Sequence, residues 1–201
     1  MIVTFTADGG GNGRIYYSDT TYAATHNSTA GDTVDAGTTN RPGQKYNVDT
    51  TYTIWRAFAP FNLGTTIPSN ATIVAGTNTF VRAVGTGGAT SDDSDSISLV
   101  ASTQASNTAL VVNDFDNVGT IKLATDKTMA SWALGNQDFQ LNTAGVAAVQ
   151  AAIGGYVKFA WRTAQDIAST PPTGANIANM GNATNLLSVE YTLPGGFLTF
   201  M

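Results

Sequence analysis

The run at 54–61, Ile-Trp-Arg-Ala-Phe-Ala-Pro-Phe, constrains the fold of this chain more than any other segment. Successive side chains of an extended strand point to opposite faces, so Ile54, Arg56 and Phe58 share one face and the residues between them share the other. Both faces are apolar apart from the arginine, which predicts a strand buried on both sides with one inward charge. The segment 67–73, Ile-Pro-Ser-Asn-Ala-Thr-Ile, supplies turn residues that lead into the next strand.

The composition favours β-structure. Charged residues make up 11% of the 201 residues, well below the roughly 25% that is usual in soluble domains, and Thr, Gly, Asn, Ala and Ser replace them. Threonine favours strands, whereas glycine and asparagine favour turns. The length suits one domain with a sizeable core. We expect a single domain over 1–192, followed by an apolar C-terminal tail at 193–201.

The pattern of short runs predicts an all-β fold. Many strands without alternating helices are typical of an antiparallel two-sheet β-sandwich, such as a jelly roll. The strands at 52–61 and 71–84 are expected to be long neighbours, and the polar stretch 171–185 is expected to be a long loop. One short helix is predicted near 144–153, capped by Thr143 and ended by Gly154 and Gly155, with a weaker helical turn at 128–134. The predicted strands are 2–6, 14–17, 32–35, 52–61, 71–84, 96–101, 109–112, 118–123, 137–141, 156–162 and 186–192.

The charge balance argues against a protein that binds nucleic acid. The net charge is −5 and the pI is near 4.5, and the nine Lys and Arg residues are scattered between Arg14 and Arg162. No apolar run reaches the roughly 20 residues that a membrane-spanning helix needs, so no membrane insertion is expected. The first residues lack the basic and apolar regions of a secretory signal, so we expect no export by a cleaved signal.

The sequence offers few residues for catalysis. His26 is the single histidine, the chain has no cysteine, and Glu190 is the sole glutamate. No Gly-x-Ser-x-Gly nucleophile motif occurs, and no aspartate stands in a strand-end position that marks it as a partner for Glu190. We therefore expect a protein that is not an enzyme, with His26 on the surface.

Asp92, Asp93 and Asp95 form the densest group of oxygen donors. Calcium takes about six to eight oxygen ligands, and an acidic loop can supply several of them. These residues are therefore a candidate calcium site. The EF-hand pattern is absent, however, and a solvated acidic turn that protects a sheet edge would use the same residues. No other cofactor is expected.

Three tyrosines near polar loops are candidates for contact with a glycan or a partner: Tyr17, Tyr22 and Tyr46. Aromatic rings expose a flat apolar surface together with a polar group, which suits stacking on a sugar. The tryptophans at 55 and 161 lie within apolar strands, so we expect them in the core instead.

Arg56 and Arg162 each interrupt an apolar strand. A buried arginine needs a partner, and the candidate carboxylates are Asp138 and Asp166. The large side chains that are expected to form the core near them are Phe58, Phe61, Phe159 and Trp161.

The C-terminal tail carries large apolar side chains beyond the last predicted core strand. They are Phe197, Leu198, Phe200 and Met201. Such groups would be an aggregation hazard in water, and the Pro-Gly-Gly turn at 194–196 allows them to reach away from the domain. We expect the tail to dock in an interface with a copy of this protein or with a different partner protein. The alternative is that it pairs with residues 2–6 of its own chain.

Several segments resemble the disaggregatase-related, or DNRLRE-type, jelly-roll domains. The matching segments are Gly-Arg-Ile-Tyr at 13–16, the run at 55–61 with the turn at 67–73, Phe-Gln-Leu-Asn at 139–142, Tyr-Val-Lys-Phe-Ala-Trp-Arg at 156–162 and Leu-Ser-Val-Glu-Tyr at 187–191. They cover most of the chain in the family's order. The chain departs from the family at Asn62, where aspartate is frequent.

The resemblance implies a fold that is similar to carbohydrate-binding modules and that recurs in phage-encoded proteins. By analogy, it implies a structural protein on the virion surface of a tailed phage: a capsid decoration protein, a head fibre or a tail-tip adhesin. Its partners would be other virion proteins or copies of itself, together with a cell-surface glycan. The alternative is a stand-alone carbohydrate-binding module located outside the cell.

Overall fold

The computed structural model describes residues 1–37 and 39–195, and most of its regular structure is strand. The strands are β1 (Ile2–Thr6), β2 (Gly13–Asp19), β3 (Thr33–Ala36), β4 (Thr39–Asn40), β5 (Gly43–Tyr46), β6 (Tyr52–Asn62), β7 (Thr72–Ile73), β8 (Phe80–Ser91), β9 (Ser96–Ser102), β10 (Val118–Lys122), β11 (Lys127–Thr128), β12 (Gly135–Gln140), β13 (Tyr156–Thr163) and β14 (Ala175–Thr192). The helices are α1 (Tyr22–His26), α2 (Thr143–Ala151) and α3 (Ala164–Ile167), with 3-10 turns η1 (Val112–Asp114) and η2 (Met129–Ser131).

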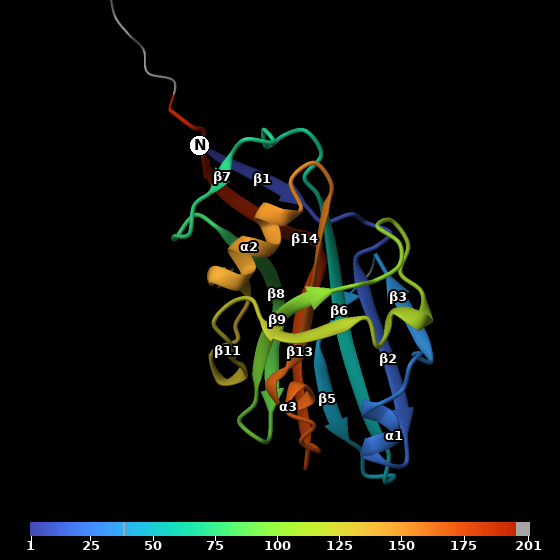
Figure 1. The fold of residues 1–201 in the computed structure, drawn as a ribbon. Coiled ribbons are helices and arrows are strands. Elements are labelled where there is room, and N and C mark those ends of the chain that lie inside the picture. The colour runs from blue at the N-terminus through green and yellow to red at the C-terminus, as the bar shows by residue number, and fades with distance from the viewer. Residues whose placement is uncertain (38, 196–201) are drawn as a thin grey trace, which may run out of the picture.

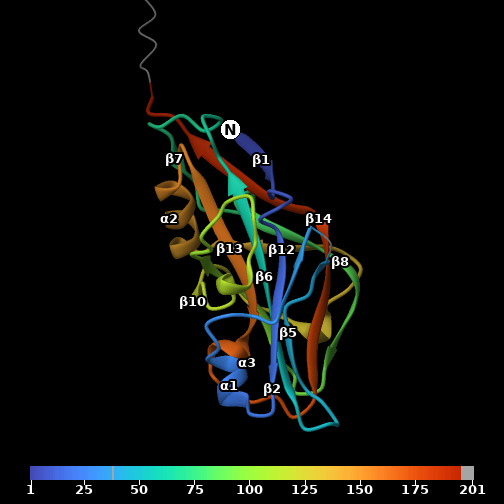
Figure 2. The same cartoon turned by 90° about the vertical axis from the view of Figure 1, so that its right-hand side faces the viewer.

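The strands form one continuous antiparallel sheet that folds over into two layers. The order along this sheet is β10-β9-β13-β6-β5-β14-β8-β12, with β2 on the other side of β6 and β1 beside β14. The long strands β6 and β14 run through the molecule and carry the sheet from one layer to the other (Figures 1 and 2). The predicted fold class, an antiparallel β-sandwich with a short helix, is confirmed.

The main core lies between the two layers. It combines inward residues of β6, β13 and β9 with inward residues of β8, β12 and β14. Phe61 and Phe159 meet edge to face across β6 and β13, with ring centroids 6.0 Å apart. The predicted core residues are confirmed, since Phe58, Phe61, Phe159 and Trp161 are all fully buried. Trp55 is a correction: it is only half-buried, because it lies near the end of β6 beside Tyr16 and Arg41.

A second, smaller core covers the outer face of the layer that contains β6. Ile54 and Phe58 point to this side, opposite to Ala57 and Phe61. The covering residues come from the segment 103–117 and from α1 and α3, and Phe115 is fully buried among them. The strand at 54–61 is therefore buried on both faces, as its sequence predicts.

The helix prediction was correct in place and wrong in its cap. The side chain of Asn142, not Thr143, accepts the hydrogen bond from Gly145 N at 3.0 Å, and α2 ends at Ala151. Gln150 fastens α2 to the segment 71–73 through Ala71 O and Ile73 N. The additional short helices α1 and α3 were not predicted, and the turn expected at 128–134 is η2.

Four predictions about the strands and loops were wrong. The stretch 71–84 contains two strands, β7 and β8, because a turn closed by Thr79 N and Gly76 O interrupts it. Moreover, β8 pairs with β12 and β14, not with β6. The predicted loop 171–185 is strand from 175 onward, since pairing with β5 and β8 on its two sides outweighs its turn-prone composition. The predicted strand 109–112 belongs to the segment that covers the second core.

Candidate functional site

Four rings stand side by side at one end of the sandwich, and we call them the aromatic row: Tyr46, Tyr52, Tyr22 and His26. The ring centroids of Tyr46 and Tyr52 are 4.8 Å apart, and Tyr22 meets Tyr52 edge to face at 5.6 Å. His26 continues the row at 5.6 Å from Tyr22. All four side chains are half-buried. The row lies at the lower end in Figure 1, around α1 and the turn between β5 and β6.

A hairpin and a short helix set the positions of these rings. Tyr46 and Tyr52 are direct partners in the antiparallel pair of β5 and β6, so their rings share one face. The hairpin loop closes through Asn47 N and Thr51 O at 2.8 Å. On the other side, Thr21 caps α1 by accepting from Ala24 N at 3.3 Å. This cap starts the helix at Tyr22 and turns its ring toward Tyr52.

A buried ion cluster of Arg56, Asp166 and Arg162 lies behind the row. Arg56 donates to both carboxylate oxygens of Asp166, with Nε–Oδ2 and Nη2–Oδ1 distances of 3.0 Å, and Arg162 Nε lies 2.6 Å from Oδ2. All three side chains are at most 4% exposed. The candidate partner Asp166 is thus confirmed for both arginines, whereas Asp138 pairs with Arg82 on the surface.

The ion cluster fastens the row to the sheet. Arg56 Nη2 also donates to His26 O at 3.1 Å, and His26 Nε2 lies 2.8 Å from Asp166 O. The other terminal nitrogen of Arg56, Nη1, donates to Phe115 O at 3.0 Å. One guanidinium therefore links α1, α3 and the covering segment. His26 was expected on the surface, but its side chain is only 17% exposed because α3 packs against it.

The electrostatics of the cluster follow from its burial. Burial raises the pKa of the Asp166 carboxyl, but the guanidiniums of Arg56 and Arg162 lower it by more, so the pKa lies well below its usual range. Burial and, next, the charge of Asp166 raise the pKa of Tyr22 far above its usual value. Its hydroxyl stays neutral, is buried and has no hydrogen-bond partner among the described residues. A buried hydroxyl of this kind can be satisfied by an ordered internal water.

The structure brings together only part of the predicted contact set. Tyr22 and Tyr46 share the aromatic row, and Tyr52, which the sequence analysis missed, joins them. A hairpin centred on the turn residues at 47–51 would have identified Tyr52 as the cross-strand partner of Tyr46. Tyr17 lies apart from the row and packs against Phe115 in the second core, with ring centroids 6.2 Å apart. Phe197, Leu198, Phe200 and Met201 lie outside the described residues.

The three aspartates of the candidate calcium loop make hydrogen bonds to different parts of the chain. Asp92 accepts from Ala175 N at 2.7 Å, and Asp93 accepts from Thr173 N and from Asn176 Nδ2. The carboxylate of Asp95 turns the other way, toward Ser96 N and Gln165 N. Within 1–37 and 39–195, no three His, Cys, Asp or Glu side chains are grouped to hold a metal ion. The first two aspartates instead fasten the loop after β8 to the start of β14.

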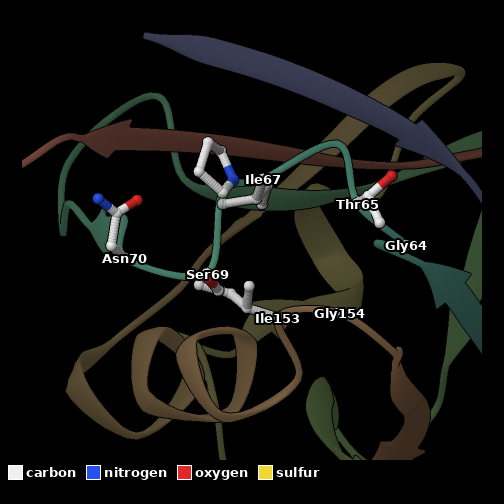
Figure 3. Close-up of a pocket in the computed structure, with 8 residues that line it drawn as sticks. Gly64, Thr65, Ile67, Ser69, Asn70, Ile153 and Gly154 are labelled. Atoms are coloured by element: carbon white, nitrogen blue, oxygen red, sulfur yellow. The ribbon is translucent and has the colours of Figure 1, made fainter.

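A separate hollow of about 370 Å³ lies between the segment 64–70 and the end of α2 (Figure 3). Its lining residues are Gly64, Thr65, Ile67, Pro68, Ser69, Asn70, Ile153 and Gly154. None of them is charged, aromatic or strongly nucleophilic, so this lining supplies neither a catalytic group nor a stacking surface. The aromatic row, on α1 and the β5–β6 hairpin, is the stronger candidate for recognition.

Among the described residues, no helix has the length and apolar character needed to span a membrane. Comparison with known proteins finds no family model that matches the sequence and no curated protein that matches it.

Proposed function

We propose that this chain is a non-enzymatic structural protein of a tailed-phage virion, built on a carbohydrate-binding-like jelly roll and exposed on the virion surface. The observation that carries the proposal is the aromatic row, whose partly exposed rings are braced from behind by the ion cluster. The order of segments that resemble phage-encoded jelly-roll domains supports the same assignment. Of the three virion roles, the row favours the tail-tip adhesin, because an adhesin needs a surface that contacts the host.

The row has the features that sugar stacking requires. Tyr46 and Tyr52 are partly exposed and are held side by side by the paired strands β5 and β6, so little conformational freedom is lost on binding. Polar groups flank the rings: His26 Nδ1 lies 2.8 Å from Asn27 Oδ1, and Ser169 Oγ lies 3.3 Å from His26 Nε2. These groups can exchange their hydrogen bonds for bonds to sugar hydroxyls. A cell-surface glycan is therefore the ligand class that we propose.

Glycan binding is tested with ring substitutions. The full chain is applied to an array of bacterial surface glycans, and affinity for any ligand found is measured by calorimetry. We expect Tyr46→Ala to weaken binding about two- to twelvefold, because one aromatic contact contributes ~0.5–1.5 kcal/mol. Tyr46→Phe should retain most of the affinity. The control is Tyr16→Ala, a half-buried tyrosine that packs on Trp55, away from the row. Equal losses for the variants at positions 16 and 46 would contradict a role for the row.

Location on the virion requires a separate test. Antibodies against the purified chain should label phage particles at one defined position, and loss of the protein should reduce attachment to host cells. A stand-alone extracellular carbohydrate-binding module is the second candidate, favoured by the same aromatic row. It would bind the glycan equally well and leave the particles unlabelled.

The C-terminal tail provides a third test of the assembly role. We expect deletion of 195–201 to abolish assembly with the copy or the other virion protein against which the tail docks, while leaving the melting temperature of the domain unchanged. A deleted chain that only melts earlier would show that the tail belongs to the core of its own domain.

A further inference from the structure

The strand β1 forms an open edge of the sheet. Its pairing partner is β14, with Ile2 opposite Glu190 and Thr6 opposite Leu186, and no other described strand pairs with it. The side chains of Ile2, Thr4 and Thr6 are exposed, and Ile2 is 58% exposed despite being apolar. Figure 2 shows β1 on the outside of β14.

The hydrogen-bond alternation shows which backbone groups face this edge. Met1 and Tyr191 exchange both of their backbone bonds, at 2.7 and 2.8 Å, and Ala7 N donates to Asn185 O at 3.0 Å. In an antiparallel pair these exchanges recur at every second residue, so the odd positions of β1 bond to β14. The N–H and C=O groups of Ile2, Thr4 and Thr6 therefore point away from β14. Among the described strands, only β14 pairs with these residues, and the next outward-facing group along the chain, Asp8 N, donates to Pro60 O of β6 at 2.9 Å.

The other outer strands have features that discourage pairing, and β1 has none. Unprotected edges invite association, and proteins protect them with charges, bulges, proline or very short strands. The edge strand β3 carries Asp35, and β12 carries Asp138. The edge strand β10 carries Lys122 and an irregular register against β9. In contrast, β1 reads Ile-Val-Thr-Phe-Thr, with neither a charge nor a proline.

We propose that two copies of this chain pair through β1, edge to edge and antiparallel, about a two-fold axis at Thr4. This register places Thr4 opposite Thr4 of the second copy and Ile2 opposite its Thr6. All the free N–H and C=O groups of these residues are then used, because the free set is symmetric about Thr4. The two sheets become one continuous sheet through the pair β1–β1.

The second copy fits this edge better than a strand of arbitrary sequence. A two-fold axis brings identical residues together, so a charge at the centre would face its own copy, and β1 carries none. The register also places the exposed Ile2 beside Thr6 of the second copy, whose neighbour on the same outward face is Leu186. The apolar exposure of Ile2 is thereby reduced. This inference does not depend on what the aromatic row binds.

Cysteine cross-linking tests the register directly, since the chain has no cysteine of its own. In the proposed dimer the two Thr4 Cα atoms lie about 5.5 Å apart, within disulfide range. Mild oxidation of the full-length Thr4→Cys chain should therefore give a disulfide-linked dimer. The matched control is Thr6→Cys, because the two copies of residue 6 are separated by four residues along the strands, roughly 14 Å. Equal cross-linking of both variants, or of neither, would overturn the register.

Sedimentation velocity across a concentration series tests the association itself. The unmodified chain should form dimers, and Thr4→Pro should weaken them more than about tenfold, because it removes one edge N–H from each copy. Proline at this position removes no bond to β14, so the isolated domain should keep its melting temperature in dilute solution. Thr4→Val keeps the N–H and should still dimerise. A monomer at all concentrations would refute the proposal. So would a dimer that survives Thr4→Pro, which would assign the interface to other residues.

Discussion

We expect Asp166→Asn to lower the stability of the fold strongly, because Asp166 is the centre of the buried ion cluster. Asp166 is 1% exposed, and its carboxylate pairs with both Arg56 and Arg162. Asparagine keeps the size of the side chain but removes its charge, and its NH₂ group faces arginine donors. Two guanidiniums are then left buried near each other, and the ion pair that remains is the one between Arg56 Nη1 and the 57% exposed Asp116, at 3.6 Å. Removing one partner from a buried ion pair costs about 3–5 kcal/mol, a large part of the ~5–15 kcal/mol by which domains are stable.

The assay is urea unfolding at neutral pH, followed by tryptophan fluorescence. The midpoint should fall strongly while the m-value stays unchanged, because the surface exposed on unfolding is the same. The matched control is Asp138→Asn. Asp138 also pairs with an arginine, Arg82, at 2.5 Å, but the two side chains are 26% and 38% exposed. An exposed pair contributes about 0–1 kcal/mol. Losses of the same size in the two variants would refute the argument that burial decides the cost.

Acidification provides an independent check of the same cluster. The pKa of Asp166 in the folded chain lies below its unfolded value, so the unfolded state binds the proton more readily. Its stabilisation is therefore fully present above the unfolded carboxyl pKa of about 3.9 and is lost as the pH falls through the folded value. The difference in stability between the unmodified chain and Asp166→Asn should narrow below about pH 4. A difference that is constant with pH would contradict the assignment.

Three further predictions concern packing and the acidic loop. Phe58→Ala should cost ~3–5 kcal/mol in urea unfolding, because Phe58 is fully buried in the second core, and a loss under ~1 kcal/mol would contradict that packing. Gly145→Ala should lower the melting temperature, because the new Cβ would lie 2.3 Å from Leu123 O. This loss is expected although alanine is the better helix former. A higher melting temperature would refute the contact. Burial raises the pKa of Asp93, but hydrogen bonds from Thr173 and Asn176 lower it by more, so exchange of the Thr173 amide should lose protection as the pH falls below about 4. Asp93→Asn should remove this pH dependence, and an unchanged profile would argue against the hydrogen bond.

The sequence by itself determined the β-rich character of the chain and the two-sided burial of 54–61. Alternation with apolar residues on both faces is a local pattern, and burial follows from it directly. The same reasoning identified Asp166 as a candidate partner for the inward arginine, because a buried guanidinium needs a carboxylate wherever the chain supplies one. It also located α2 from helical spacing.

Only the tertiary structure decided which strands are neighbours and which side chains meet. The polar stretch 175–181 is strand because β8 pairs with it on one side and β5 and β4 pair with it on the other, and no local pattern encodes that pairing. Tyr46 meets Tyr52 through a hairpin register, and Tyr22 reaches them because the ion cluster fastens α1 to the sheet. Likewise, β1 reads as an ordinary strand in the sequence, and only the topology leaves its outer edge open. Long-range pairing and burial decide these features, and both depend on residues far apart in the chain.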